Sequence, residues 1–140
     1  MAWDVATWQL AFRIEKAGYY VERVGCSSSL KQTPQEIQQE VTKQIEACCA
    51  TSDHQVHFVG HSLGGLMIRT YLQDNKVEKL GRVVLIGTPN QGMPVVDYYR
   101  DRWWMKMLGP MANALGTDSE SFPNTLIGPY YPVGVIAGVT

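Results

Sequence analysis

The spacing of apolar side chains predicts a helix at the start of this chain of 140 residues and a strand directly after it. Residues 3–16 carry apolar side chains at helical spacing, and Gly18 is a natural helix stop. Residues 19–24 then alternate between apolar and charged side chains, which is the pattern of a half-buried strand. The chain is therefore predicted to begin with a helix followed by a strand.

A second predicted helix opens with a capping box. Thr33 can serve as the N-cap, Pro34 suits the first helical turn, and Glu36 can reach back to the amide of the cap residue. Three apolar residues four positions apart would form one stripe that lies on a sheet: Ile37, Val41 and Ile45. We expect this helix to end near Ala50.

The middle of the chain predicts a strand, a helix and a further strand. A β-rich run covers residues 56–59, helical spacing follows over residues 63–73, and a continuous apolar run occupies residues 83–86. Continuous apolar strands are typical of parallel sheets that are covered by helices on both faces. Residues 1–140 are therefore predicted to form one α/β domain with a mostly parallel sheet and flanking helices, whose core elements lie in residues 3–88.

Between the β-rich run and the helix, Ser62 occupies the centre of the pattern GxSxG. A serine hydroxyl is a weak nucleophile, so it must stand at a sharp turn where a base and backbone amides converge on one carbonyl. The amide of Leu63 is placed to donate to an oxyanion, Gly60 and Gly64 would avoid collisions around the turn, and Gly65 would let the helix approach closely. The alternative is a tight glycine turn that only packs a helix on a sheet.

Three segments match one family: VHFVGHSLGGLMIR at residues 56–69, GRVVLIGTPNQG at residues 81–92, and AGYYVERV at residues 17–24. Together they resemble the lipase and esterase branch, triacylglycerol-lipase-like, of the α/β-hydrolase superfamily over most of residues 8–92. The resemblance implies hydrolysis of carboxylic esters by Ser62, with an ester or lipid-like substrate and no cofactor.

The same resemblance implies parts that this sequence lacks. In the family an early strand ends in a loop that supplies a second oxyanion donor, and the triad acid and histidine follow later strands. This chain begins with a predicted helix and reaches none of those positions, so we expect a hydrolase truncated at both ends and poorly active alone. A gap would separate the strand at residues 19–24 from the strand before Ser62, which favours aggregation or a complementing chain.

The histidines all precede the serine: His54, His57 and His61. His61 neighbours Ser62, but side chains around the turn point apart, so we interpret it as structural or pocket-lining. We interpret His57 as a satisfied imidazole in the core or at an edge, and His54 as a loop residue. The sequence therefore offers no triad base.

The irregular interval at residues 89–132 resembles a lid-like insertion, and residues 133–139 form a last apolar run that predicts a strand. Within the interval, DYYRDRWWMKML at residues 97–108 places aromatic residues and methionine next to charge. A lid over an acyl pocket and an ordinary amphipathic packing helix both fit this pattern. Three aspartates of the interval are interpreted as solvated or capping carboxylates rather than the triad acid: Asp97, Asp101 and Asp118.

Composition and charge exclude several classes of protein. With 45% hydrophobic and 18% charged residues, the chain fits one globular domain. A formal net charge of -1 and a pI near 6.3 give no basic field for nucleic acid. No apolar run is long enough to span a membrane and no signal peptide is recognisable, so a cytoplasmic location is the expectation.

The cysteines, Cys26, Cys48 and Cys49, do not predict a metal site. Zinc would require CxxC-type pairs with histidines at ligand spacing, and this chain has none. Adjacent cysteines bridge with difficulty inside a helix, so we expect free thiols in a reducing setting.

Two other functions remain open beside ester hydrolysis. A hydrolase remnant without catalysis would act as an interaction module, binding another chain through the gap in its sheet and the WWM segment. An acyltransferase would use the same serine turn to pass an acyl group to an alcohol or amine.

Overall fold

The fold centres on a small open sheet in which all strands run parallel. The structure is a computed structural model that describes residues 2–25, 33–49, 51–91, 114, 122–126 and 128–138. Strand β1 is Val56–His61, β2 is Leu80–Ile86 and β3 is Val133–Ile136, in the spatial order β1-β2-β3. Both strand pairs are parallel, so the predicted α/β fold with a parallel sheet is confirmed.

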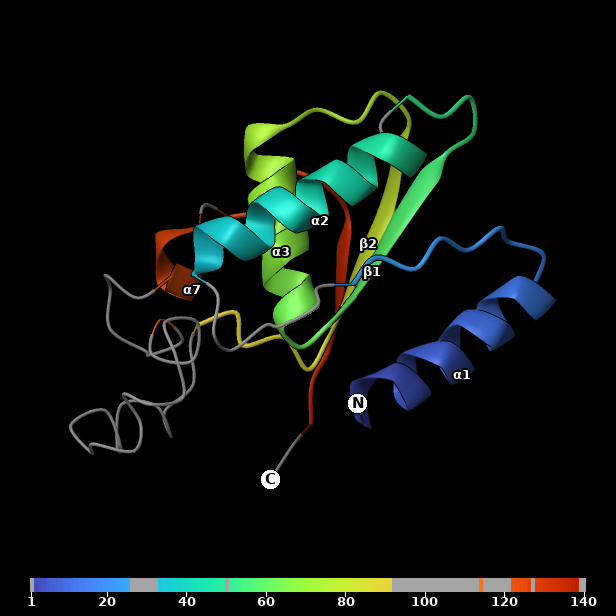
Figure 1. Ribbon diagram of the computed structural model, residues 1–140, viewed down its shortest axis with the longest axis horizontal. Coiled ribbons are helices and arrows are strands. Elements are labelled where there is room, and N and C mark those ends of the chain that lie inside the picture. Colours follow the sequence, from blue (N-terminus) through green and yellow to red (C-terminus); the bar gives the residue numbers. More distant parts are fainter. Residues whose placement is uncertain are drawn as a thin grey trace.

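Helices lie on both sides of this sheet. Helix α2, Pro34–Cys48, and helix α3, Leu63–Asp74, lie together on one side, and helix α1, Ala2–Lys16, lies on the other (Figure 1). The three predicted helices are therefore present, with ends within two residues of the predicted positions.

Helix α2 begins where its capping box predicts. The amide of Glu36 donates to the Thr33 hydroxyl over 3.2 Å, and the amide of Thr33 donates to the Glu36 carboxylate over 3.1 Å. These bonds satisfy two backbone donors at the helix start, which is worth about 1 kcal/mol in similar helices. The predicted apolar stripe is buried: Ile37, Val41 and Ile45.

The hydrophobic core lies between the sheet and the helices α2 and α3. Strand side chains that face this layer, such as Phe58 and Val83, pack with the α2 stripe and with α3. Helix α3 contributes the largest group of buried residues: Leu66, Met67, Ile68, Tyr71 and Leu72. Tyr131, just before β3, also joins this core although the sequence pattern did not single it out.

The prediction of a strand at residues 19–24 is wrong. These residues form no strand in the structure, and Tyr20 is 88% exposed. Instead of a strand ladder, the backbone of Gly25 exchanges two hydrogen bonds with the Gln44 side chain of α2, over 3.2 and 2.6 Å. The alternating pattern is real, but a strand needs a paired neighbour, and none of the described strands pairs with this segment.

The prediction of free thiols at Cys48 and Cys49 is also wrong, because the structure joins them in a disulfide. Helix α2 ends at Cys48, and Cys49 has left the helical conformation, with φ -137° and ψ -25°. The expectation assumed a continuous helix through both residues, and the helix end removes that constraint. Cys26 lies outside the described residues.

The interval between β2 and β3 is described only in part. Residues 122–125 form a short helix, α7 (Phe122–Thr125), and β3 covers four residues of the predicted last strand. The lid-like segment at residues 97–108 and the three aspartates, Asp97, Asp101 and Asp118, lie outside the described residues. The two interpretations of that segment therefore stay predictions.

Candidate functional site

Ser62 lies at the junction between β1 and α3, in a strained backbone conformation. It is the N-cap of α3 and has φ 53° and ψ -122°. Among the described residues it is the only non-glycine residue with positive φ. Such a conformation costs about 1–3 kcal/mol and persists only where the surrounding structure enforces it.

Hydrogen bonds to neighbouring backbone hold this turn at the carboxyl end of the sheet. The amide of Ser62 donates to the carbonyl of Ile86 at the end of β2 over 2.9 Å, which extends the β1–β2 ladder by one bond. The amide of Gly65 donates to the Ser62 carbonyl over 3.1 Å. Ligands of open α/β sheets bind at this edge, outside the carboxyl ends of the strands.

Two glycines, Gly60 and Gly65, make room for the turn. A Cβ at Gly60 would lie 2.6 Å from the Cα of Gly65 and 2.8 Å from Ile68 Cδ1. A Cβ at Gly65 would collide with the side chain of Thr88, whose Cγ2 would be 2.7 Å away. At Gly64 a Cβ would meet no atom of the described residues within 4 Å, so the steric need for glycine at this position stays a prediction.

The turn places the Ser62 hydroxyl beside the first amide of α3. The Ser62 side chain is half-buried and makes no capping hydrogen bond to α3. Leu63 is the first residue of α3, and amides in the first turn of a helix have no partner within the helix. The helix dipole adds partial positive charge at the same point, so negative charge is favoured beside the Ser62 hydroxyl.

His57 is not arranged as a base for Ser62. His57 lies five residues before Ser62, or about 16 Å along a strand. Its Nδ1 accepts a hydrogen bond of 2.9 Å from the Arg82 amide, and its ring meets the ring of Tyr19 edge-on. This bond lies where the β1–β2 register shifts, so the prediction of a satisfied edge imidazole is confirmed. His54 lies in the loop before β1, and His61 is half-buried at the end of β1.

A comparison with protein-family models places the serine turn inside a known family. The model of the palmitoyl protein thioesterases matches residues 4–127, which include the whole serine turn. The chain belongs to the palmitoyl protein thioesterase family. No curated protein and no solved structure matches it. Because this is an α/β-hydrolase-type family, the resemblance to hydrolases and the partial α/β-hydrolase fold are both confirmed.

Arg69 of this thioesterase-family chain links α3 to the loop after β2, a role that sequence reasoning missed. Its guanidinium donates to the carbonyl and the side-chain oxygen of Asn90, each over 3.2 Å, and to the carbonyl of Leu126 over 3.5 Å. Burial lowers the pKa of Arg69 and raises the pKa of nearby Tyr131. The only hint in the sequence of this role was the position of Arg69 two helical turns after Ser62. An arginine at such a position is equally compatible with a solvated side chain.

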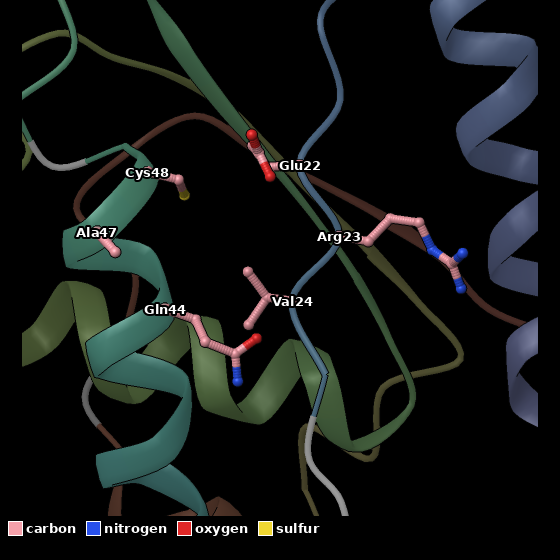
Figure 2. Close-up of a pocket in the computed structure, with 6 residues that line it drawn as sticks. All are labelled: Glu22, Arg23, Val24, Gln44, Ala47 and Cys48. Atoms are coloured by element: carbon pink, nitrogen blue, oxygen red, sulfur yellow. The ribbon is translucent and has the colours of Figure 1, made fainter.

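A hollow of about 360 Å³ lies away from the residues of the serine turn, between α2 and the extended segment before it. Figure 2 shows Val24 directed toward Gln44 of α2, whereas Arg23 points away toward α1. Its lining includes none of the predicted site residues: Glu22, Arg23, Val24, Gln44, Ala47 and Cys48. The serine turn therefore remains the candidate site of this thioesterase-family chain.

The described part of the chain adds two further observations. Its histidines, cysteines and acidic residues form no group of three that could hold a metal ion. None of its helices is long and apolar enough to cross a membrane.

Proposed function

We propose that this chain carries the nucleophile of a serine hydrolase that cleaves acyl thioesters or esters. The strained backbone of Ser62 is the observation that carries the proposal, because a residue other than glycine is held at positive φ at the strand-to-helix turn. Strain of this kind clusters at functional sites, and nucleophile elbows of hydrolases have this geometry. A tight packing turn would not need serine at the strained position.

The proposed chemistry has two steps. The Ser62 oxygen attacks the acyl carbonyl carbon, and the Leu63 amide stabilises the negative charge that develops on the carbonyl oxygen. The tetrahedral intermediate collapses, the bond to the thiolate or alkoxide breaks, and the leaving group takes a proton. Water then attacks the acyl-serine and releases a carboxylic acid. The hydroxyl must lose its proton to a base in the first step.

We infer that this base does not come from the histidines of this chain. His57 is too far along β1, and its Nδ1 already accepts a hydrogen bond from Arg82. A triad acts as a unit, so without its base the rate falls by roughly a millionfold, although the amide donors keep a residual acceleration. The chain alone is therefore proposed to be poorly active, with histidine and acid supplied by sequence outside residues 1–140 or by a complementing chain.

The substrate class is the finer part of the proposal. The family name points to thioesters of palmitoyl groups on proteins, whereas the GHSLGG pattern resembles lipases that act on carboxylic esters. A lipid-like acyl group is common to both. Purified chain would be incubated with an S-palmitoylated peptide and, separately, with a p-nitrophenyl ester, each with Ser62→Ala as the control.

Turnover slightly above that of the Ser62→Ala control would support the proposal, and the preferred substrate would decide between thioester and ester. Equal rates in the two proteins would refute a nucleophilic role for Ser62. Rapid turnover by the wild type would refute the inferred lack of a base. Adding competing alcohols or amines and analysing the products would separate acyl transfer from hydrolysis.

A non-catalytic interaction module is the second candidate, and the edges of the sheet favour it. Strands β1 and β3 both end the described sheet with an unpaired side, and Val59, Val135 and Ile136 are more than 40% exposed. Unpaired edges with apolar side chains invite another chain. A complementing chain that binds and restores hydrolysis would support the hydrolase, whereas binding without activity would support the module.

A further inference from the structure

We propose that Thr88 is a positioning residue for Ser62 and that Arg69 holds Thr88 in place through Asn90. The inference rests on the proposed role of Ser62 as a nucleophile. Thr88, Arg69 and Asn90 need not touch a substrate, because they would act through the backbone of the turn.

The side chain of Thr88 fills the notch that Gly65 leaves in the first turn of α3. A Cβ at Gly65 would collide with Thr88 Oγ1 and would lie 2.7 Å from its Cγ2 and 2.8 Å from its Cβ. The hydroxyl oxygen therefore lies directly against the backbone of Gly65. Because the Gly65 amide donates to the Ser62 carbonyl over 3.1 Å, Thr88 packs against the peptide unit that closes the turn.

Burying the Thr88 hydroxyl beside Gly65 costs free energy of folding. Its oxygen is buried and has no hydrogen-bond partner among the described residues, although the residue as a whole is only half-buried. A buried hydroxyl without a partner destabilises a fold, so such a group calls for a physical reason. Close packing against Gly65 supplies such a reason. The space beside Gly65 is narrow, and a hydroxyl oxygen is smaller than a methyl group at the same place.

A short chain of contacts connects Thr88 to α3 from the other direction. The backbone amide of Asn90 donates to the Thr88 carbonyl over 2.8 Å. The guanidinium of Arg69 donates to both the backbone and the side-chain oxygen of Asn90. Arg69 and Gly65 lie on the same helix, one turn apart. Helix α3 therefore contacts the loop after β2 at two points: Gly65 packs against Thr88, and Arg69 binds Asn90.

This arrangement would set the direction of the Ser62 hydroxyl and the Leu63 amide. Positive φ at Ser62 is strained, so the turn would relax if the contact behind it were loosened. A displacement of about 1 Å at a reacting group can cost on the order of a hundredfold in rate. The rate of reaction at Ser62 should therefore respond to Thr88 more than the affinity for a ligand does.

The test measures phosphonylation of Ser62 by a fluorophosphonate probe, followed by peptide mass mapping over a range of probe concentrations. This assay separates the maximal rate from the probe affinity. Thr88→Ala removes the packing, Thr88→Ser keeps the oxygen, and Thr51→Ala is an exposed control. We expect Thr88→Ala to lower the maximal rate about tenfold with similar probe affinity, and Thr88→Ser to restore it to within about twofold.

Paired substitutions test the contact itself. Gly65→Ala should reduce the rate strongly, and adding Thr88→Gly should recover part of it, because the colliding side chain is gone. Arg69→Met should slow labelling in the same way as Thr88→Ala, whereas Arg13→Met on the exposed side of α1 should not. Thermal unfolding of each variant would show whether it is folded.

Equal labelling rates in folded wild type, Thr88→Ala and Arg69→Met would overturn the positioning role. So would a loss in Thr88→Ser equal to that in Thr88→Ala. Failure of the proposed function looks different, because Ser62 would then stay unlabelled in every protein, including the wild type in the presence of a chain that supplies histidine and acid. In that case Gly65→Ala and Thr88→Gly would still be coupled in thermal stability.

Discussion

Replacing Gly60 by alanine should destabilise the protein strongly, although alanine suits both strands and helices better than glycine elsewhere. The new Cβ would lie 2.6 Å from the Cα and 2.7 Å from the amide nitrogen of Gly65, and 2.8 Å from Ile68 Cδ1. The isoleucine tip can move, but the two backbone atoms belong to the first turn of α3. Overpacking of this kind costs about 1–3 kcal/mol, and the backbone collision places Gly60→Ala near the upper end.

Gly64→Ala is the matched control, because a Cβ there would meet no atom within 4 Å in the part of the chain that the structure describes. Alanine favours the helix over glycine by up to about 1 kcal/mol, so this variant should be as stable as the wild type or slightly more stable. Thermal unfolding followed by circular dichroism would compare them. For a chain of this length we expect Gly60→Ala to unfold about 10 °C lower. Equal melting temperatures for the two variants would refute the close approach of α3 to β1.

Other predictions follow from strain, hydrogen bonding and burial. Ser62→Gly should stabilise the fold by about 1 kcal/mol in denaturant unfolding, because glycine accepts positive φ, whereas Ser62→Ala should not; equal effects would contradict the strain. His57→Ala should cost about 0.5–1 kcal/mol, because the exposed Arg82 amide exchanges its acceptor for water, whereas His54→Ala in the loop should be near neutral; the reverse order would exclude that role for His57. Burial raises the pKa of Tyr131, so above the usual tyrosine pKa of about 10 the unfolded state loses this proton first and stability falls as pH rises toward the folded pKa. Tyr131→Phe should make the free energy of unfolding depend less steeply on pH between about pH 10 and the folded pKa; an unchanged profile in Tyr131→Phe would rule out the burial effect.

Local signals in the sequence were sufficient to predict most of the elements. The capping box at Thr33 and the apolar stripe of α2 involve residues only a few positions apart, and both are confirmed. The strand, serine and helix around Ser62 were predicted for the same reason. Patterns of this kind depend on helical or strand periods within one segment, and they do not require knowledge of distant partners.

Apart from the disulfide between the adjacent Cys48 and Cys49, the features that could not be predicted from the sequence depend on distant partners. Residues 19–24 have the pattern of a strand, but whether they form one depends on a neighbouring strand. The motif assigned glycine to Gly60 and Gly64 and gave Gly65 the close approach of the helix, but it could not show that the crowding partner of Gly65 is Thr88, 23 positions further along the chain. Arg69 carries no local signal either, because its partners lie in the loop after β2 and beyond α7.

The central claim is that Ser62 is a nucleophile at a strained turn and that its general base is not supplied by the histidines of this chain. Intact-mass and peptide analysis after exposure to a fluorophosphonate tests it most directly, with Ser62→Ala as the comparison. We expect one slowly formed adduct on Ser62, absent from Ser62→Ala, and faster formation when a chain that supplies histidine and acid is added. An adduct that persists in Ser62→Ala, or no adduct on Ser62 even with such a chain, would contradict the account.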